Sequence, residues 1–339
     1  MILLKPNGRI DLEHRAYFLR NAPGQSAIIA ADKEGRYSIV SADFGESRSY
    51  RRSSTLRTIS PHPVAPWLAL VDNDSGSLIV QTLDGDRLVQ ISPSQVGGTA
   101  PNWIKQGFGD CLFDDGGEFL WLVAPRSAED IAVCLIETTN WSFVDNVIIH
   151  DPFGGSSCSF HDTGRPGLMV LWLAAGQDGQ QVYWLNRSHN NVSCDREPRL
   201  ENTCPPIFSP NKEEILVINE KSAICKYSLP SMNLVAPPLE SGDDDDPFAE
   251  SLVYLTERQA LAGTNEGRMF MVDTARMRIE DEVAVGEHSP SSTKEQELGA
   301  SIAWFTGVGD VVVFICRRDR GTGLQGWKDS LLCYSAVKG

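Results

Sequence analysis

The sequence lacks the features of a membrane protein. It contains no run of about 18 apolar residues, so we expect no membrane-spanning helix. Met1–Pro6 holds only a short apolar stretch with no basic residues before it, so we expect no signal peptide and a cytoplasmic location. Basic residues are also scarce, because 30 lysines and arginines stand against 45 acidic residues, for a formal net charge of −15. This negative field opposes nucleic acids and anionic membranes as partners.

Metal-binding and redox motifs are absent as well. The eight cysteines form no C-x-x-C pair, and most lie in apolar segments such as Ile131–Ile136, so we expect buried free thiols. The six histidines stand apart, without an H-x-H or H-E-x-x-H arrangement. His62 and His161 occupy corners between predicted strands, where we expect exposed imidazoles. The sequence therefore predicts no metal site and no cofactor.

Motifs of common catalytic and nucleotide-binding sites do not occur. There is no G-x-S-x-G elbow of a serine hydrolase and no P-loop, and we predict no catalytic residue. Gly321–Gly326 matches the letters G-x-G-x-x-G, but it falls in a predicted loop between two strands, with no helix after it. A dinucleotide site uses the N-terminus of that helix, so this match predicts no such site.

Short strands separated by turns are what the sequence does contain. Within Ile207–Leu229, the pair Ile207-Phe208 precedes a Ser-Pro-Asn turn, Ile215–Ile218 is a continuous apolar run, and Ala223–Leu229 follows a second turn. Proline presets φ in the first turn, while serine and asparagine bond their own backbone. A continuous apolar run is typical of a strand covered on both faces. The segment thus predicts three antiparallel strands joined by hairpins, and we expect Asn233–Ala236 to add a fourth.

The same pattern recurs along the chain with a period of roughly 45–50 residues, the period of four-stranded propeller blades. One globular core rarely exceeds about 250–300 residues, but repeats avoid that limit because each packs only on its neighbours. No segment of the 339 residues shows sustained helical periodicity. We therefore predict an all-β fold, a seven-bladed β-propeller, as a single domain over residues 1–339. The predicted blades span residues 12–56, 57–93, 103–150, 153–200, 201–240, 247–286 and 297–338.

The seventh predicted blade has only three strands. A short apolar strand at Ile2–Leu4 has no partner nearby in the sequence. If residues 1–11 supply the missing strand, the ring exposes no sheet edge on which another chain could pair. We therefore predict that the N-terminal strand closes the propeller.

Two turns and one hairpin resemble those of WD-repeat β-propellers. Phe208–Asn211 and Phe113–Gly116 resemble the family's turn between the first two strands of a blade, and Ala262–Thr274 resembles its second and third strands. The family's Gly-His pair before a blade and Trp-Asp pair at its end do not occur. The resemblance covers nearly the whole chain and implies the propeller fold.

A complete ring with long loops and no catalytic motif indicates a non-catalytic scaffold for protein–protein interaction. Loops that join the second and third strands of a blade share a rim with the linkers between blades, and we expect protein partners to bind there. The alternative is an enzyme, a hydrolase or lyase, that acts on a small substrate in the axial channel. Sequence spacing does not decide between the two, because a channel site would gather residues from several blades.

The clearest candidate for a binding loop is a basic cluster near the C-terminus. Arg317, Arg318 and Arg320 precede Trp327 in a long loop of an otherwise acidic chain. Arginine and tryptophan are enriched at the centres of protein interfaces. We therefore predict that this loop contacts a partner.

The remaining predicted binding residues lie in other loops of the same rim. They are Arg126, His150, Asp243 and Asp244. The four adjacent carboxylates of Asp243–Asp246 do not alternate as calcium ligands do. We expect a solvated acidic loop, which could attract a basic partner.

Overall fold

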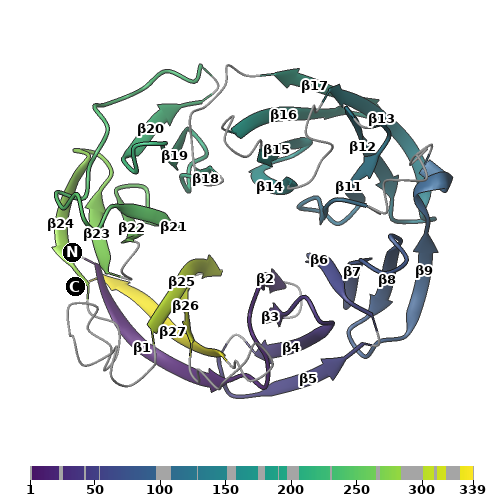
Figure 1. Ribbon diagram of the computed structural model, residues 1–339, viewed down its shortest axis with the longest axis horizontal. Coiled ribbons are helices and arrows are strands. Elements are labelled where there is room, and N and C mark those ends of the chain that lie inside the picture. The colour runs from purple at the N-terminus through teal and green to yellow at the C-terminus, as the bar shows by residue number, and fades with distance from the viewer. Residues whose placement is uncertain are drawn as a thin grey trace. The chain divides into compact units, whose positions relative to one another are not determined.

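A computed structural model of the chain (Figure 1) describes fifteen segments. These are residues 2–22, 26–41, 43–52, 54–96, 108–127, 129–150, 158–174, 180–189, 191–196, 206–229, 231–264, 268–283, 301–308, 311–317 and 329–338. They are almost entirely β-strand and turn, and Pro93–Val96 forms a short 3-10 helix. Within these segments, no helix is long and apolar enough to cross a membrane.

The described strands form six four-stranded sheets and one three-stranded sheet. In all but one sheet the neighbouring strands follow one another in the chain, so hairpins join them. Four sheets come from the first part of the chain: β2 (Phe18–Ala22), β3 (Ala27–Ala31), β4 (Arg36–Ser41) and β5 (Ser47–Arg51); β6 (Leu56–Pro61), β7 (Trp67–Asp72), β8 (Leu78–Thr82) and β9 (Arg87–Ile91); β10 (Cys111–Phe113), β11 (Phe119–Pro125), β12 (Asp130–Glu137) and β13 (Ser142–His150); β14 (Cys158–Arg165), β15 (Leu168–Ala174), β16 (Gln180–Ser188) and β17 (Asn191–Arg196).

The other three sheets come mainly from the second part of the chain. They are β18 (Ile207–Phe208), β19 (Glu214–Ile218) and β20 (Ile224–Ser228); β21 (Phe248–Thr256), β22 (Gln259–Thr264), β23 (Met269–Asp273) and β24 (Arg278–Glu282); and β25 (Ser301–Val308), β26 (Val311–Arg317) and β27 (Asp329–Lys338), the last of which pairs with β1 (Ile2–Asp11). The three strands predicted within Ile207–Leu229 correspond to β18, β19 and β20, with boundaries that move by one residue.

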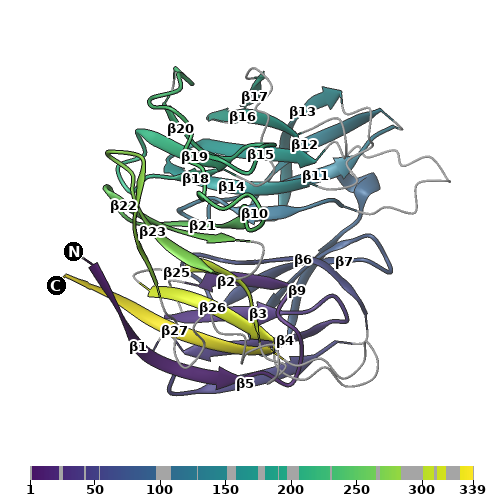
Figure 2. The same ribbon diagram turned by 60° about the vertical axis from the view of Figure 1, so that its left-hand side comes forward.

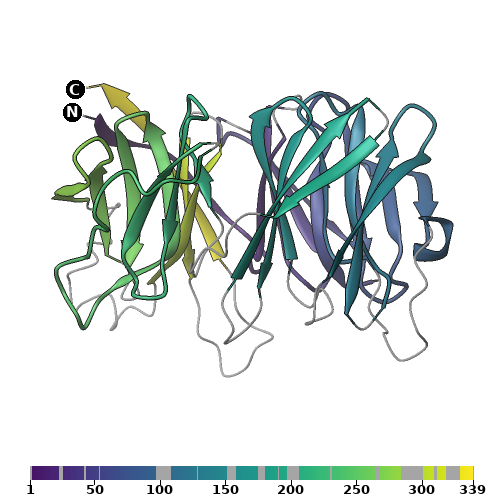
Figure 3. The same ribbon diagram turned by 90° about the horizontal axis from the view of Figure 1, so that it is seen from above.

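The contacts between residues divide the chain into two compact units. The first unit comprises Met1–Leu19, Ser38–Ser49 and Glu201–Gly339. The second comprises Arg20–Tyr37 and Tyr50–Leu200, and it contains the three sheets that start at β6, β10 and β14. Figure 3 shows the hairpins of these three sheets from the side, with turns at both ends of the strands.

Alternating side chains of β11 hold the second unit together. Leu120, Leu122 and Ala124 belong to a buried cluster with residues of β7 and β8. Trp121 and Val123 point to the other face, into a cluster with residues of β14 and β15. Both faces of the strand are therefore covered, which explains why its sequence is apolar throughout.

The strand β1 pairs with the last strand of the chain. Its register runs from Ile2 opposite Lys338 to Asp11 opposite Ser330, with an irregularity between Pro6 and Gly8. Figure 2 shows β1 alongside β27, and the two chain ends lie together there. The strand is longer than the Ile2–Leu4 segment predicted from apolar residues alone, because the backbone ladder continues through Arg9 and Asp11.

The three-stranded sheet corrects one prediction. Asn233–Ala236 is not a strand, and its segment meets β20 only through isolated bridges, Leu234 to Tyr227 and Leu239 to Ile224. Pro237 and Pro238 lie between the two bridges. Proline has no N–H to donate and therefore interrupts a regular ladder.

Six of the cysteines are free thiols. Cys111, Cys134, Cys225 and Cys333 are buried, and Cys158 and Cys194 are half-buried. Burial raises the pKa of Cys134 to about 12, so this thiol is unreactive at neutral pH.

Candidate functional site

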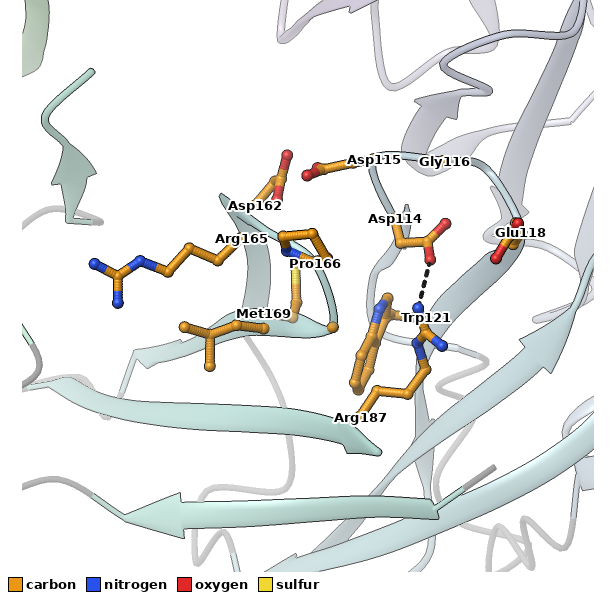
Figure 4. A pocket seen from close by; sticks show the side chains of 12 residues that line it. Asp114, Asp115, Gly116, Glu118, Trp121, Asp162, Arg165, Pro166, Met169 and Arg187 are labelled. Carbon is orange, nitrogen blue, oxygen red and sulfur yellow. Dashed lines mark hydrogen bonds and ion pairs between the residues drawn. The ribbon is translucent and has the colours of Figure 1, made fainter. Parts of the chain in front are cut away.

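A pocket of about 250 Å³ lies within the second unit (Figure 4). One wall is the turn between β10 and β11, and the other is the turn between β14 and β15. Arg187, near the end of β16, lines the inner part. Trp121 and Met169, each only 1% exposed, supply apolar surface.

The first wall is a tight turn over Asp114–Gly117. The Gly117 N–H donates to the Asp114 carbonyl at 2.9 Å, and the Phe119 N–H donates to Asp114 Oδ1 at 3.1 Å. Gly117 has φ of +71°, which favours glycine. The hydroxyl of Thr138 donates to the Gly117 carbonyl at 2.6 Å and fixes the turn to the end of β12.

His62 supports this turn from a neighbouring sheet. Its Nδ1 accepts the N–H groups of Val64 (3.1 Å) and Ala65 (2.9 Å), so Nε2 carries the proton and donates to the Gly117 carbonyl at 3.0 Å. Its ring also packs against Phe113, with 4.8 Å between centroids. Burial lowers the pKa of His62. The prediction that the His62 imidazole is exposed is therefore wrong, because His62 is only 6% exposed. Its ring face packs against Phe113, and its Nε2 proton is bonded to the Gly117 carbonyl.

Asp114 and Arg187 form an ion pair at the inner end of the pocket. Their Oδ2 and Nη2 atoms are 3.4 Å apart, and the guanidinium also lies over the Phe119 ring, 4.1 Å from its centroid. Burial raises the pKa of the Asp114 carboxyl, although the Phe119 N–H and Arg187 act in the opposite direction. The Arg187 guanidinium in the pocket wall therefore contacts both a carboxylate and an aromatic ring.

The second wall is a turn that begins at Asp162. Its Oδ1 accepts the Gly164 N–H at 2.8 Å, and Thr163 donates its hydroxyl to the Leu168 carbonyl at 2.8 Å. Gly164 and Gly167 both have positive φ. Short polar side chains that bond the backbone in this way stabilise a turn.

Carboxylates dominate the charge of the pocket. Asp114, Asp115, Glu118 and Asp162 face two guanidinium groups, those of Arg165 and Arg187. Asp115 and Glu118 are exposed and have no ion pair among the described residues. The mouth of the pocket is therefore negative.

Of the basic cluster predicted as a binding loop, the structure places only Arg317. This residue ends β26, opposite Asp329 of β27. Arg318, Arg320 and Trp327 lie outside the described residues. The role of this loop stays a prediction.

Arg126 and His150 both lie close to Asp130. The Arg126 N–H donates to the Asp130 carbonyl at 3.1 Å, and His150 Nδ1 is 3.3 Å from Asp130 Oδ1. The Ser127 hydroxyl, and then His150, lower the pKa of the Asp130 carboxyl. Both predicted residues are exposed at the end of the sheet away from the pocket, which leaves them available to a partner.

Asp243 and Asp244 are exposed, but Asp246 of the same loop is buried and accepts the Thr264 hydroxyl at 2.8 Å, so the expected solvated acidic loop is only partly correct. Asp243 lies 3.4 Å from a guanidinium nitrogen of Arg268, which also binds Glu282 at 2.9 Å. The loop is thus partly neutralised by an arginine of its own sheet. The described residues contain no group of histidine, cysteine, aspartate or glutamate side chains that could hold a metal ion.

A second polar cluster of the same unit involves β14. Ser159 Oγ and His161 Nε2 are 2.7 Å apart, and burial together with the charge of Arg20 lowers the pKa of His161 to about 3. Asp110 accepts the Phe160 N–H at 2.7 Å, and burial raises its pKa. His161 is half-buried rather than exposed as predicted.

Sequence reasoning treated Asp114 and Asp162 only as turn formers. A signal for the pocket was nevertheless present, because Asp114 follows the first strand of one four-strand set and Asp162 lies near the end of the first strand of the next. Equivalent turns of neighbouring sheets project from the same edge, so their carboxylates were bound to approach one another. Arg187 gave no such signal, since it lies inside a strand.

Comparison with known proteins establishes the fold. No protein-family model and no curated protein matches the sequence. Among solved structures, the β-propeller domain of Cps50 (Swd1) from Myceliophteria thermophila is 9% identical with a TM-score of 0.62, over 96% of this chain and 99% of that one. U3-55K is 13% identical with a TM-score of 0.64, over 97% and 99%. The β-propeller fold predicted from the repeats and from the resemblance to WD-repeat proteins is confirmed.

Proposed function

We propose that this chain is a non-catalytic scaffold for protein–protein interaction, built as a seven-bladed propeller that its N-terminal strand closes. The observation that carries the proposal is the pocket between the β10–β11 and β14–β15 turns. Pockets for drug-sized ligands measure about 300–1,000 Å³. A volume of about 250 Å³ suits one side chain of a partner better than a complete small substrate.

Two surfaces are available for partners. The pocket lies where first-to-second strand turns project. The loop between β11 and β12, which holds Arg126, lies at the other end of those strands. We retain the predicted rim with Arg317, Arg318, Arg320 and Trp327 as the second contact surface, beside Arg126, His150, Asp243 and Asp244.

An enzyme is the second candidate, and the Ser159–His161 pair favours it. With its low pKa, His161 is neutral at pH 7, and its Nε2 lies 2.7 Å from the Ser159 hydroxyl. A hydrolase of this kind also uses a group that orients the second imidazole nitrogen. His161 has no carboxylate partner among the described residues, which favours the scaffold.

Quantitative affinity capture from the native cell extract tests the proposal. The double variant Arg318→Ala, Trp327→Ala should keep the melting temperature of the wild type and lose a partner that the wild type captures, because central arginine and tryptophan contacts contribute about 2 kcal/mol or more each. Arg87→Ala, Leu88→Ala on the exposed strand β9 is the matched control and should retain the partner.

Two results would count against this function. If the double variant melts earlier but its folded fraction binds with full affinity, Trp327 packs on its own sheet and the loop is no contact surface. Covalent labelling of Ser159 by a fluorophosphonate, abolished by His161→Asn, would instead support the hydrolase.

A further inference from the structure

We propose that the pocket between the two turns receives an arginine side chain from a basic segment of a protein partner. This inference rests on the proposed scaffold function and names the chemistry of one contact. Its occupant is identified by the size of the pocket, by its charge and by the contacts that Arg187 makes in the pocket wall.

The charge of the pocket selects a cation. Asp115 and Glu118, both exposed and without an ion pair among the described residues, come from one turn, and Asp162 comes from the other. The chain as a whole carries a formal net charge of −15, which attracts a basic partner from a distance. Arg165 and Arg187 offset part of this charge, but the four carboxylates of the lining remain in excess and favour a cationic occupant over an anionic one.

Arg187 shows how a guanidinium fits there. It forms an ion pair with Asp114 while its plane lies over the Phe119 ring. The pocket offers a similar pair of contacts, carboxylates for the charge and the aliphatic atoms of Leu168 and Met169 for the stem, without an aromatic ring like Phe119. A second guanidinium would thus meet surroundings like those of the first.

The arrangement of the carboxylates favours arginine over lysine. Asp115 and Asp162 come from different turns (Figure 4), so an occupant that pairs with both must offer more than one donor. A guanidinium has five N–H donors in a rigid plane, whereas an ammonium is a compact and strongly hydrated charge. The arginine stem can also lie along the apolar atoms while its charged end stays at the mouth.

A peptide titration tests the assignment on the full chain. The probe is acetyl-Gly-Gly-Arg-Gly-Gly-amide, compared with the same peptide carrying uncharged citrulline, a near-isostere of arginine. Binding is read by NMR from the amides of Gly116 and Gly167, which line the pocket, with Gly85 as a distant reference. We expect saturable shifts of the two pocket amides with the arginine peptide and at least tenfold weaker binding of the citrulline peptide.

Single-charge variants locate the binding. Asp115→Asn and Asp162→Asn should each weaken binding about tenfold, whereas Asp86→Asn should change it less than twofold. Asp86 is an equally exposed carboxylate outside the pocket, so its variant has the same net charge as the other two. Asparagine at position 162 keeps an oxygen for the Gly164 N–H and preserves the turn. If either variant loses cooperative unfolding, Glu118→Gln replaces it.

Three outcomes would overturn the assignment: equal binding of the arginine and citrulline peptides, equal weakening by Asp86→Asn, or a lysine peptide that binds as tightly as the arginine peptide. None of them bears on capture of partners through the loop of Arg318 and Trp327. Conversely, a chain that captures no partner but binds the arginine peptide would refute the scaffold function and retain the pocket chemistry.

Discussion

Gly117, in the wall of the pocket, lies so close to His62 that no side chain would fit at this position. The residue has φ of +71°, and a Cβ built there would overlap the His62 ring. The same ring accepts two backbone amides and donates to the Gly117 carbonyl, so it has no free space into which it could withdraw. The conformation of the turn thus depends on a residue of another sheet.

We predict that Gly117→Ala lowers the free energy of unfolding by about 3 kcal/mol, from positive φ and from overpacking against His62 together. Gly85→Ala is the control, since Gly85 has φ of +97° but nothing within 4 Å of its added Cβ, and it should lose only about 1 kcal/mol. Urea unfolding measures both. If both variants lose the same free energy of unfolding, the overlap with the His62 ring does not destabilise the fold.

Sequence reasoning could predict the turn at Asp114–Gly117 but not its dependence on His62. Turn chemistry is local, and aspartate and glycine at fixed offsets reveal it. The His62–Gly117 contact joins residues 55 positions apart, and a lone histidine before a turn is compatible with either exposure or burial. The pairing becomes visible only when the neighbouring sheets are in place.

At the scale of the secondary-structure element, a buried charge links β19 with β20. Lys226 on β20 is 5% exposed, and its Nζ lies 3.1 Å from Glu214 Oε1 on β19. The Glu214 side chain is 28% exposed and therefore reaches water. If the pair is broken, the Glu214 carboxylate can be hydrated, whereas the buried Lys226 ammonium cannot.

The two single substitutions should therefore differ in cost. Glu214→Gln leaves the buried Lys226 ammonium without a counter-charge and should lower the free energy of unfolding by about 3 kcal/mol. Lys226→Met fills the same space with apolar atoms and leaves Glu214 hydrated, so we expect a change within about 1 kcal/mol. Chemical denaturation of both variants measures the two free energies of unfolding. A larger loss in Lys226→Met than in Glu214→Gln would refute this account of the pair.

Strands were predictable where apolar residues run continuously or alternate, as in β12 and β19, because burial on both faces leaves that pattern. Prediction was less successful at polar outer strands. β24 has no buried residue, and the predicted strand at Asn233–Ala236 is absent because Pro237 and Pro238 interrupt pairing. Outer strands carry few buried residues, so their sequences contain little periodic signal.

At the scale of the whole molecule, the repeat explains why the fold was easier to predict than the site. A recurring four-strand pattern over the chain is a redundant signal, and a mistake in one repeat does not hide the others. The pocket has no such redundancy, since it depends on two turns and on Arg187 from within a strand. The solved propellers share this architecture at 9% and 13% identity, which shows how little side-chain detail the fold itself requires.

The pairing of β1 with β27 yields the last prediction, which concerns the closure that we propose for the propeller. Deleting residues 1–11 would expose one edge of β27, whose Leu331 and Cys333 are fully buried in the intact chain. An open edge with apolar residues is a template for pairing with other chains. We expect the truncated chain to melt earlier and to self-associate, as measured by calorimetry and by light scattering after size exclusion.

A peptide of residues 1–11 added in trans should restore the monomer through strand addition, and a peptide of the same composition in scrambled order should not. A truncated chain that stays monomeric with an unchanged melting temperature would show that β1 is dispensable and that closure does not depend on it.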